Sequence, residues 1–392
     1  MRGKHANKIL FVCNFLSKGW EVSILGLLVF IVDQHKLPVY MFGILSTVFI
    51  VSQITVSFFA GKITHAISSR NIIFFSIAAS GIAWLTLFLT SQVSWLYLAY
   101  MFGGISSGLF EPIGNSLVAK LSSSKNRGTA IGNFAAFGDM GRIAVVAAAT
   151  ALAGLLGVNN TCGVMFATAA VALVLAAVSI GGAAGAGHSE AEVEIPVALG
   201  DLLKNKKFCL ATIAGIADSF SSASLYIFIP VLLTAKHIAL ADTLYFNVIF
   251  FAGYMSGRLV LGRLADKHGA PHILIVSKIG MTVLILLLVL LSGKVMMIGL
   301  LFLLGVFTRG SSPIIRAMVA DSMDQKISFH NAFSAYSSAS RGSSAVCRPI
   351  YGYLAFYAGI SSVFYAAAAV SLLTVYPAAK YKNEPSAPLA TT

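Results

Sequence analysis

The feature that most constrains this chain is the recurrence of apolar stretches long enough to cross a lipid bilayer. A membrane-spanning helix needs about 20 predominantly apolar residues. Of the 392 residues, 57% are hydrophobic and 10% are charged, whereas a soluble protein carries about 25% charged residues. The composition excludes a soluble enzyme and a disordered chain, and it predicts an all-α membrane protein. We place twelve spans at residues 9–32, 40–61, 71–91, 94–119, 129–157, 161–185, 208–233, 241–263, 272–292, 295–320, 329–357 and 359–379.

The twelve spans divide into two groups of six around the longest polar interval. We therefore expect an N-terminal six-helix bundle at 1–187, a cytoplasmic linker at 188–207 and a C-terminal six-helix bundle at 208–392. The halves also repeat weakly at a shift of 201 residues. An even number of spans in each repeat predicts two pseudo-symmetric bundles of the same orientation. The matching positions are Gly61 and Gly262, Gly104 and Gly305, Pro112 and Pro313, and Val118-Ala119 and Val319-Ala320.

The distribution of basic residues predicts the orientation. They gather on one predicted side of the membrane, and the connections on the other side hold only Lys36, Lys236 and Lys294. Lys and Arg are enriched in cytoplasmic loops, so we expect both termini in the cytoplasm and a bacterial inner membrane as the location. The same bias explains the net charge of +13 without nucleic acid as a partner. The expected functional unit is a monomer in the lipid bilayer.

A short polar segment, Gly262-Arg-Leu-Ala-Asp266-Lys267-His-Gly269, joins spans eight and nine. Gly262 would permit close packing at a helix end. The carboxylate of Asp266 can accept hydrogen bonds from the N–H groups that begin the next helix, or it can pair with an arginine. The alternative is a generic turn with a basic flank.

The counterpart of this segment between spans two and three keeps its glycine, Gly61, and its terminal basic residue, Arg70, but has His65 in place of the aspartate. With the arrangement of six plus six spans, these segments resemble the cytoplasmic loop signature of the major facilitator superfamily. Tyr100 stands where many proton-driven members carry an arginine. The resemblance implies a central site lined by spans one, four, seven and ten, flanked by spans two, five, eight and eleven. It also implies transport by alternating access.

Ionisable residues near the middle of the spans are the most informative for function. Each costs about 2.5–3.5 kcal/mol at a helix centre, so they are expected to pair or to line a hydrated cavity. They are Lys18 and Glu21 in span one, Glu111 in span four, Asp139 and Arg142 in span five, Asp218 in span seven, Arg309 and Arg316 in span ten, and Arg341 and Arg348 in span eleven.

Their spacing favours two kinds of arrangement. Residues three apart on a helix share a face, so Lys18 with Glu21 and Asp139 with Arg142 can form ion pairs, and a purely structural role is the alternative. Arginines 309 and 316 lie seven residues apart, as do arginines 341 and 348. Seven residues make two helical turns, so each pair presents a ladder on one face.

The excess of buried cations predicts an anionic substrate. Six cations stand against four anions in the set above, and a guanidinium binds carboxylate or phosphate in bidentate fashion. The alternative for the two arginines nearest the helix ends, 316 and 348, is that they only reach lipid headgroups. The candidate substrate-binding residues are Arg309, Arg142, Arg341, Lys18, Asn115, Arg316 and Arg348.

The buried acids are the candidate proton carriers, namely Asp218, Glu111, Glu21 and Asp139. We rank Asp218 and Glu111 first, because neither has a cation within one turn of its own helix. The alternative is that Glu21, Glu111 or Asp218 is a permanent counter-ion of Arg309 or Lys18. No phosphate-binding loop, metal-ligand spacing or cofactor motif accompanies them.

The sequence therefore predicts a secondary active transporter that moves a small organic anion, carboxylate or phosphate, by alternating access with proton coupling. The first alternative is a proton-driven exporter of amphipathic or cationic drugs. The second is a receptor or a lipid-moving protein on the same scaffold. An enzyme is the least expected class, since no nucleophile–base pair or metal constellation is present.

Overall fold

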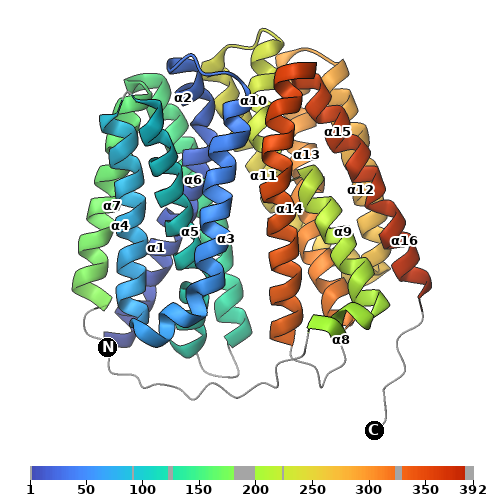
Figure 1. Cartoon of the computed structure of the whole chain (residues 1–392), viewed down its shortest axis with the longest axis horizontal. Helices are drawn as coiled ribbons and strands as arrows, with labels where there is room; N and C mark the ends of the chain where they lie inside the picture. Colours follow the sequence, from blue (N-terminus) through green and yellow to red (C-terminus); the bar gives the residue numbers. More distant parts are fainter. Residues whose placement is uncertain are drawn as a thin grey trace. The chain divides into compact units, whose positions relative to one another are not determined.

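A computed structural model describes residues 2–90, 92–121, 127–180, 199–222, 225–322 and 329–384. Every regular element within these ranges is an α-helix (Figure 1). The chain divides into two compact units, Met1–His188 (unit 1) and Ser189–Thr392 (unit 2). Unit 1 contains α1 (Arg2–Gly26), α2 (Leu28–Gln34), α3 (Tyr40–Ala66), α4 (Ser69–Leu89), α5 (Val93–Leu121), α6 (Arg127–Leu156) and α7 (Val158–Ile180).

Unit 2 repeats this arrangement of long helices. Its elements are α8 (Leu199–Lys204), α9 (Lys206–Ser222), α10 (Leu225–Ala235), α11 (Leu240–His268), α12 (Ala270–Leu290), α13 (Lys294–Asp321), α14 (Phe329–Ala358), α15 (Ile360–Leu373) and α16 (Val375–Asn383).

Eleven helical segments within the described residues are long and apolar enough to cross a membrane. Some predicted spans consist of two helices, as with α1 and α2, which meet at Leu27, and α15 and α16, which meet at Thr374. The predicted span 329–357 corresponds to α14, a 30-residue helix whose several serines and two arginines make it less apolar than the others. The fold is thus that of an all-α, multi-pass membrane protein.

The segment between spans eight and nine differs from the prediction. We expected a connection that begins at Gly262, but α11 continues as a helix to His268. The chain turns at Gly269, whose φ of +88° suits a residue without a side chain. The run Arg-Leu-Ala-Asp-Lys-His contains no helix breaker, so the helix extends beyond the apolar stretch that marked the span.

Helices and close contacts of the two units correspond when their residue numbers are shifted by a constant amount. At a shift of 201 residues, α4 and α12 have the same bounds, and α5 and α13 begin together. A close helix contact is also repeated: a Cβ on Gly104 would lie 2.1 Å from the carbonyl oxygen of Phe49, and a Cβ on Gly305 would lie 2.1 Å from that of Phe250. Only glycine permits this approach, so the repeat preserves the packing of α3 on α5 and of α11 on α13.

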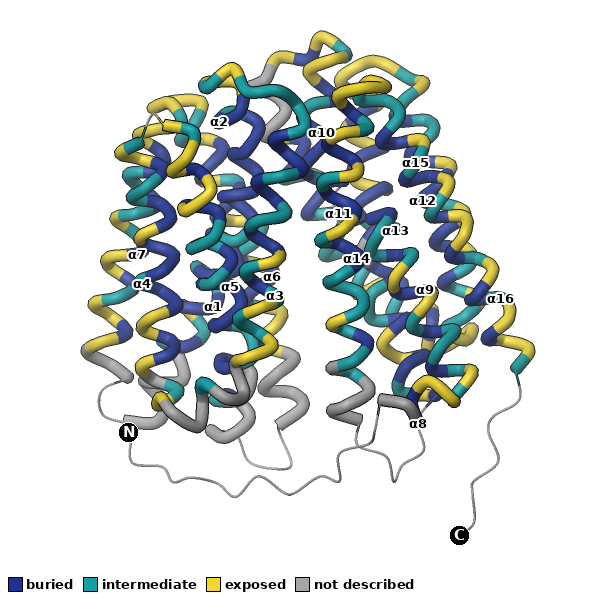
Figure 2. Tube along the Cα trace, in the orientation of Figure 1, coloured by how far each residue is buried: buried dark blue, intermediate teal, exposed yellow. Residues whose placement is uncertain are grey.

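Residue burial has the same pattern in both units (Figure 2). Buried residues follow the inward faces of the helices within each unit, and exposed ones follow the outward faces. Many exposed side chains are large and apolar, such as Phe58, Leu155 and Val295. A water-soluble protein exposes few such patches, so these side chains are suited to contact with lipid.

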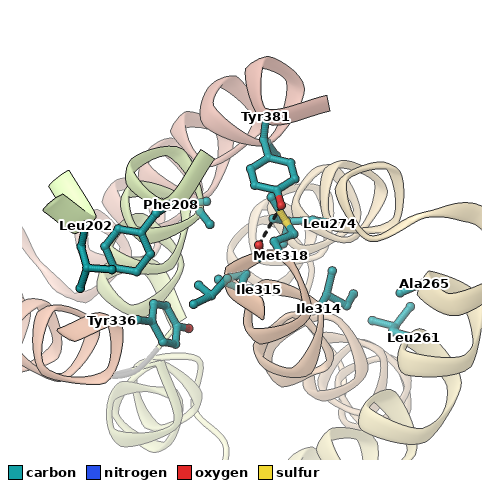
Figure 3. Close-up of a cluster of buried hydrophobic side chains, with 14 residues drawn as sticks. Leu202, Phe208, Leu261, Ala265, Leu274, Ile314, Ile315, Met318, Tyr336 and Tyr381 are labelled. Atoms are coloured by element: carbon teal, nitrogen blue, oxygen red, sulfur yellow. Dashed lines mark hydrogen bonds between the residues drawn. The ribbon is translucent and has the colours of Figure 1, made fainter. Parts of the chain in front are cut away.

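One buried cluster fixes an end of unit 2 (Figure 3). Leu202 of α8 and Phe208 of α9 belong to the same cluster as Tyr336 of α14 and Tyr381 of α16. The hydroxyl of Tyr381 donates to the carbonyl oxygen of Met318, at 2.8 Å. The cluster therefore ties α8 to the helices that follow it.

Candidate functional site

Unit 1 contains a network of five charged side chains from three helices. The ammonium of Lys18 on α1 lies 3.0 Å from Glu21 Oε2 and 2.9 Å from Glu111 Oε2 on α5. On α6, Arg142 Nη1 lies 2.7 Å from Asp139 Oδ1, and Arg142 Nη2 lies 3.9 Å from Glu21 Oε2. Both pairs expected from three-residue spacing form, and Glu21 joins them into one network.

Small residues allow the helices to approach closely enough for this network. A Cβ on Gly141 of α6 would lie 2.0 Å from the carbonyl oxygen of Phe15 on α1. A Cβ on Gly138 would lie 2.7 Å from Nδ2 of Asn14, which itself donates to the carbonyl oxygen of Phe134 at 2.6 Å. The backbones of α1 and α6 are therefore in contact beside the charged residues.

Among the five described side chains of the network, acids outnumber bases. Three carboxylates face two cations, so the five side chains carry a net charge of −1 when all are ionised. Lys18 is only 8% exposed, whereas one third of the Glu111 side chain is exposed. A net charge on buried groups is costly, and a proton on one carboxyl group would balance the charges of these five side chains, of which Glu111, Asp139 and Arg142 also make further contacts. The arrangement is chemically suited to take up and release a proton.

Unit 2 has a different buried charge cluster. Asp218 on α9 forms an ion pair with Lys278 on α12, and the hydroxyl of Ser311 on α13 donates to the same Oδ1 of Asp218 at 2.8 Å. Lys278 is fully buried, and Asp218 is nearly so. Our first-ranked proton carrier thus has a cation from another helix, which favours the counter-ion alternative for Asp218.

The arginines of unit 2 are differently placed. Arg348 on α14 is buried, Arg341 is half-buried and Arg316 on α13 is exposed. Among the other acids with described side chains in unit 2, Asp266, Asp321 and Glu384 lie at or near helix ends. Two predicted substrate-binding side chains, those of Asn115 and Arg309, lie outside the described residues, although their backbones belong to α5 and α13.

In the polar segment at 262–269, Asp266 and Lys267 are exposed in the last turns of α11. The first turn of α12 has no side-chain cap; its N-cap is Gly269. Capping of that helix by Asp266, one of its two predicted roles, is not among the described contacts, and pairing with an arginine stays a prediction. Among the described residues, no group of three or more His, Cys, Asp or Glu side chains could hold a metal ion.

The shift of 201 residues relates the unit 1 network to hydroxyl groups in unit 2. The counterparts of Lys18, Glu21, Glu111, Asp139 and Arg142 are Ser219, Ser222, Ser312, Ser340 and Ser343, in that order. The hydroxyl groups of Ser219 and Ser340 share a hydrogen bond, as their charged counterparts belong to one network. All five charges of unit 1 are thus replaced by serine at equivalent positions.

Sequence reasoning missed Lys278, which provides the ion-pair partner of Asp218. The sequence did indicate a special role for this residue, because Lys278 is the one Asp, Glu, Lys or Arg in the span 272–292. It lies closer to the middle of that span than to either end. With Lys278, the sequence has seven cations against four acids at these positions, and the described cations that are buried are Lys18, Lys278 and Arg348.

The family model of the Major Facilitator Superfamily matches residues 9–249 and again residues 211–391. The two matches together cover nearly the whole chain, and the chain belongs to this superfamily. The family and the fold indicate a membrane transporter and not an enzyme. No curated protein matches the sequence as a relative.

Solved structures with the same fold include transporters of several kinds. The nucleoside transporter NupG has a TM-score of 0.79 at 12% identity, with 96% of this chain and 99% of that chain covered. A D-xylose-proton symporter has a TM-score of 0.78 at 12% identity, with 97% and 98% covered. A bacterial homolog of the human lysosomal transporter Spinster, inward-facing and occupied, has a TM-score of 0.76 at 13% identity, with 97% and 96% covered.

Proposed function

We propose that this transporter moves a small organic anion, a carboxylate or a phosphate, by alternating access with coupling to protons. The proposal depends on the division of charge between the two units. Unit 1 has an acid-rich network that gains neutrality by binding one proton. In unit 2 the described side chains include the buried cations Lys278 and Arg348 and the half-buried Arg341, and a guanidinium group is suited to bind an anion. We further propose that it works as a monomer in a bacterial inner membrane, with both termini in the cytoplasm.

In unit 1, Glu111 is the proposed proton-binding residue. Its carboxylate contacts Lys18 at 2.9 Å, and it is the most exposed of the acids in the network. When Glu111 binds a proton, Lys18 keeps its contact with Glu21, at 3.0 Å. The cluster then has two cations and two anions, so the remaining charges balance. Glu21 and Asp139 are proposed as partners that hold this balance.

In unit 2, arginines 341 and 348 of α14, together with Arg309 of α13, are the proposed anion ligands. The one buried acid among the described side chains of unit 2, Asp218, is paired with Lys278. A guanidinium stays ionised in a poorly hydrated site, and its fixed fork of donors matches a carboxylate or phosphate. Arg316 is exposed and is proposed as an accessory residue on the approach to the site.

The test uses the purified full-length protein in vesicles that contain a pH-sensitive dye and have equal pH on both sides. Carboxylates of one to three acid groups and inorganic phosphate are added outside in turn, with the membrane potential clamped by potassium and valinomycin. We expect at least one anion to change the internal pH, and Lys206→Ala to behave as wild type because that side chain is 81% exposed. A response to cationic amphiphiles alone would contradict the proposal and favour drug export.

A further inference from the structure

A small cavity lies inside unit 1, beside the charged network. Its volume is about 10 Å³, which is room for roughly one water molecule. Residues from α1, α3, α4 and α5 line it. The polar ones are Ser17, Trp20, Glu21, Ser80, Trp84, Ser106 and Ser107.

Trp84 provides the first sign that this cavity has a polar occupant. Its side chain is fully buried, and its indole Nε1 makes no hydrogen bond to any described residue. The other tryptophan of the lining, Trp20, donates its N–H to Thr168 Oγ1 at 3.2 Å. Buried donors are almost always hydrogen-bonded to protein or to ordered water, so Trp84 requires an acceptor.

Glu21 provides the second sign that the cavity has a polar occupant. Both of its ion pairs, with Lys18 and with Arg142, use the oxygen Oε2. Oε1 takes part in neither pair, and Glu21 lines the cavity. Ser107 adds a further polar group, because its hydroxyl accepts from Gln53 Nε2 at 2.7 Å and still has its own proton to donate.

We propose that this cavity is a hydration site, in which one water molecule accepts the N–H of Trp84 and donates to the carboxylate of Glu21. Water fits because it both accepts and donates, and because the site offers two to four polar partners. A metal cation fits poorly, since the N–H of Trp84 and the ammonium of Lys18 would both repel it.

The repeat supports a site special to unit 1. The counterparts of Ser80 and Trp84 in unit 2 are Met281 and Ile285, both fully buried. These apolar side chains offer nothing for a water to bind. The hydration site itself does not depend on the proposed function. Its role, to give protons access to the charged network through Glu21, rests on the proposed function.

The test uses the purified full-length protein labelled with ¹⁵N at the tryptophan indoles. The chain has three tryptophans, so three indole signals are expected. Trp84→Phe identifies the Trp84 signal by its loss, and Trp95→Phe identifies the signal of Trp95, which lies outside the cavity lining. We expect a cross-peak between the Trp84 N–H and a long-lived water. We also expect Glu21→Gln to shift the Trp84 signal and to leave that of Trp95, which is half exposed, unchanged.

Absence of the water cross-peak, together with a Trp84 signal that ignores Glu21→Gln, would overturn the proposal. A saturable shift with sodium chloride but not with choline chloride would also overturn it, in favour of a cation site. The readout involves no substrate. A failure of the hydration site therefore leaves anion transport intact, and a failure of anion transport leaves this result unchanged.

Discussion

The two units have the same helix packing but different chemistry. The same contact of a glycine with a phenylalanine carbonyl occurs at Gly104 in unit 1 and at Gly305 in unit 2. At equivalent positions near mid-membrane, unit 1 has five charged residues and unit 2 has five serines. Among the described side chains of unit 2, the buried acid is Asp218, and its partner comes from α12. The counterpart of α12 in unit 1, α4, carries no charge in its middle.

This difference shows which properties the repeat requires and which it leaves free. Close backbone contacts depend on glycine, so both units keep them. A buried charge needs only a local partner, so each unit can balance charge with different residues. The comparison therefore predicts equal responses to changes in packing and unequal responses to changes at the charged positions.

The largest loss of stability is expected when the buried ion pair of unit 2 is broken. Asp218→Asn leaves the ammonium of Lys278 buried without its counter-ion, which costs about 3–5 kcal/mol. Thermal unfolding of the purified variant in detergent measures this loss. The double variant Asp218→Asn with Lys278→Met removes both charges and should recover most of the stability. Equal losses in the single and double variants would show that the ion pair is not the cause.

The next effect is expected at the centre of the unit 1 network. Lys18→Met leaves Glu21 and Glu111 close together with like charges, at a cost of about 2–3 kcal/mol, less than for Asp218 because Glu111 is partly hydrated. The loss should diminish when the pH is lowered, because protonation removes the repulsion between the acids. Thermal unfolding across a pH series measures it. A loss that does not change with pH would contradict the network's excess of acid.

A moderate loss of stability, equal in the two units, is expected when the repeated glycines are substituted. Gly104→Ala and Gly305→Ala each place a methyl group against a carbonyl oxygen, which costs about 1–3 kcal/mol by overpacking. Thermal unfolding of the two variants compares the halves directly. Stabilities that differ by more than about 1 kcal/mol would show that the repeat does not preserve packing at these contacts.

The smallest effects are expected at hydroxyl groups and at the exposed helix end. Ser219→Ala removes one hydrogen bond, to Ser340, for about 0.5–1.5 kcal/mol. This variant is the matched control for Lys18→Met, because it changes the equivalent position. Asp266→Asn, on an exposed side chain, should alter stability by less than about 0.5 kcal/mol. A Ser219→Ala loss as large as that of Lys18→Met would remove the contrast between the units.

The helices and the repeat could be predicted from sequence because they depend on local patterns. A span requires only length and apolarity, and two residues three apart on a helix share a face. Local spacing left the contact of Lys18 with Glu111 as one alternative and gave no sign of the contact of Lys278 with Asp218, since 93 and 60 residues separate the partners. Asp218 has no cation nearby in sequence, which made it resemble a proton carrier. Helix packing supplied the partner.

The central claim is that unit 1 holds the proton and unit 2 holds the anion. It is tested most directly by measuring two activities on the same vesicles: anion-driven proton movement and exchange of labelled anion for unlabelled anion. The claim predicts that Glu111→Gln abolishes proton movement but retains exchange, and that Arg348→Ala abolishes both. If Glu111→Gln still moves protons with the anion, or if Arg348→Ala exchanges the anion normally, the division of roles between the two units is contradicted.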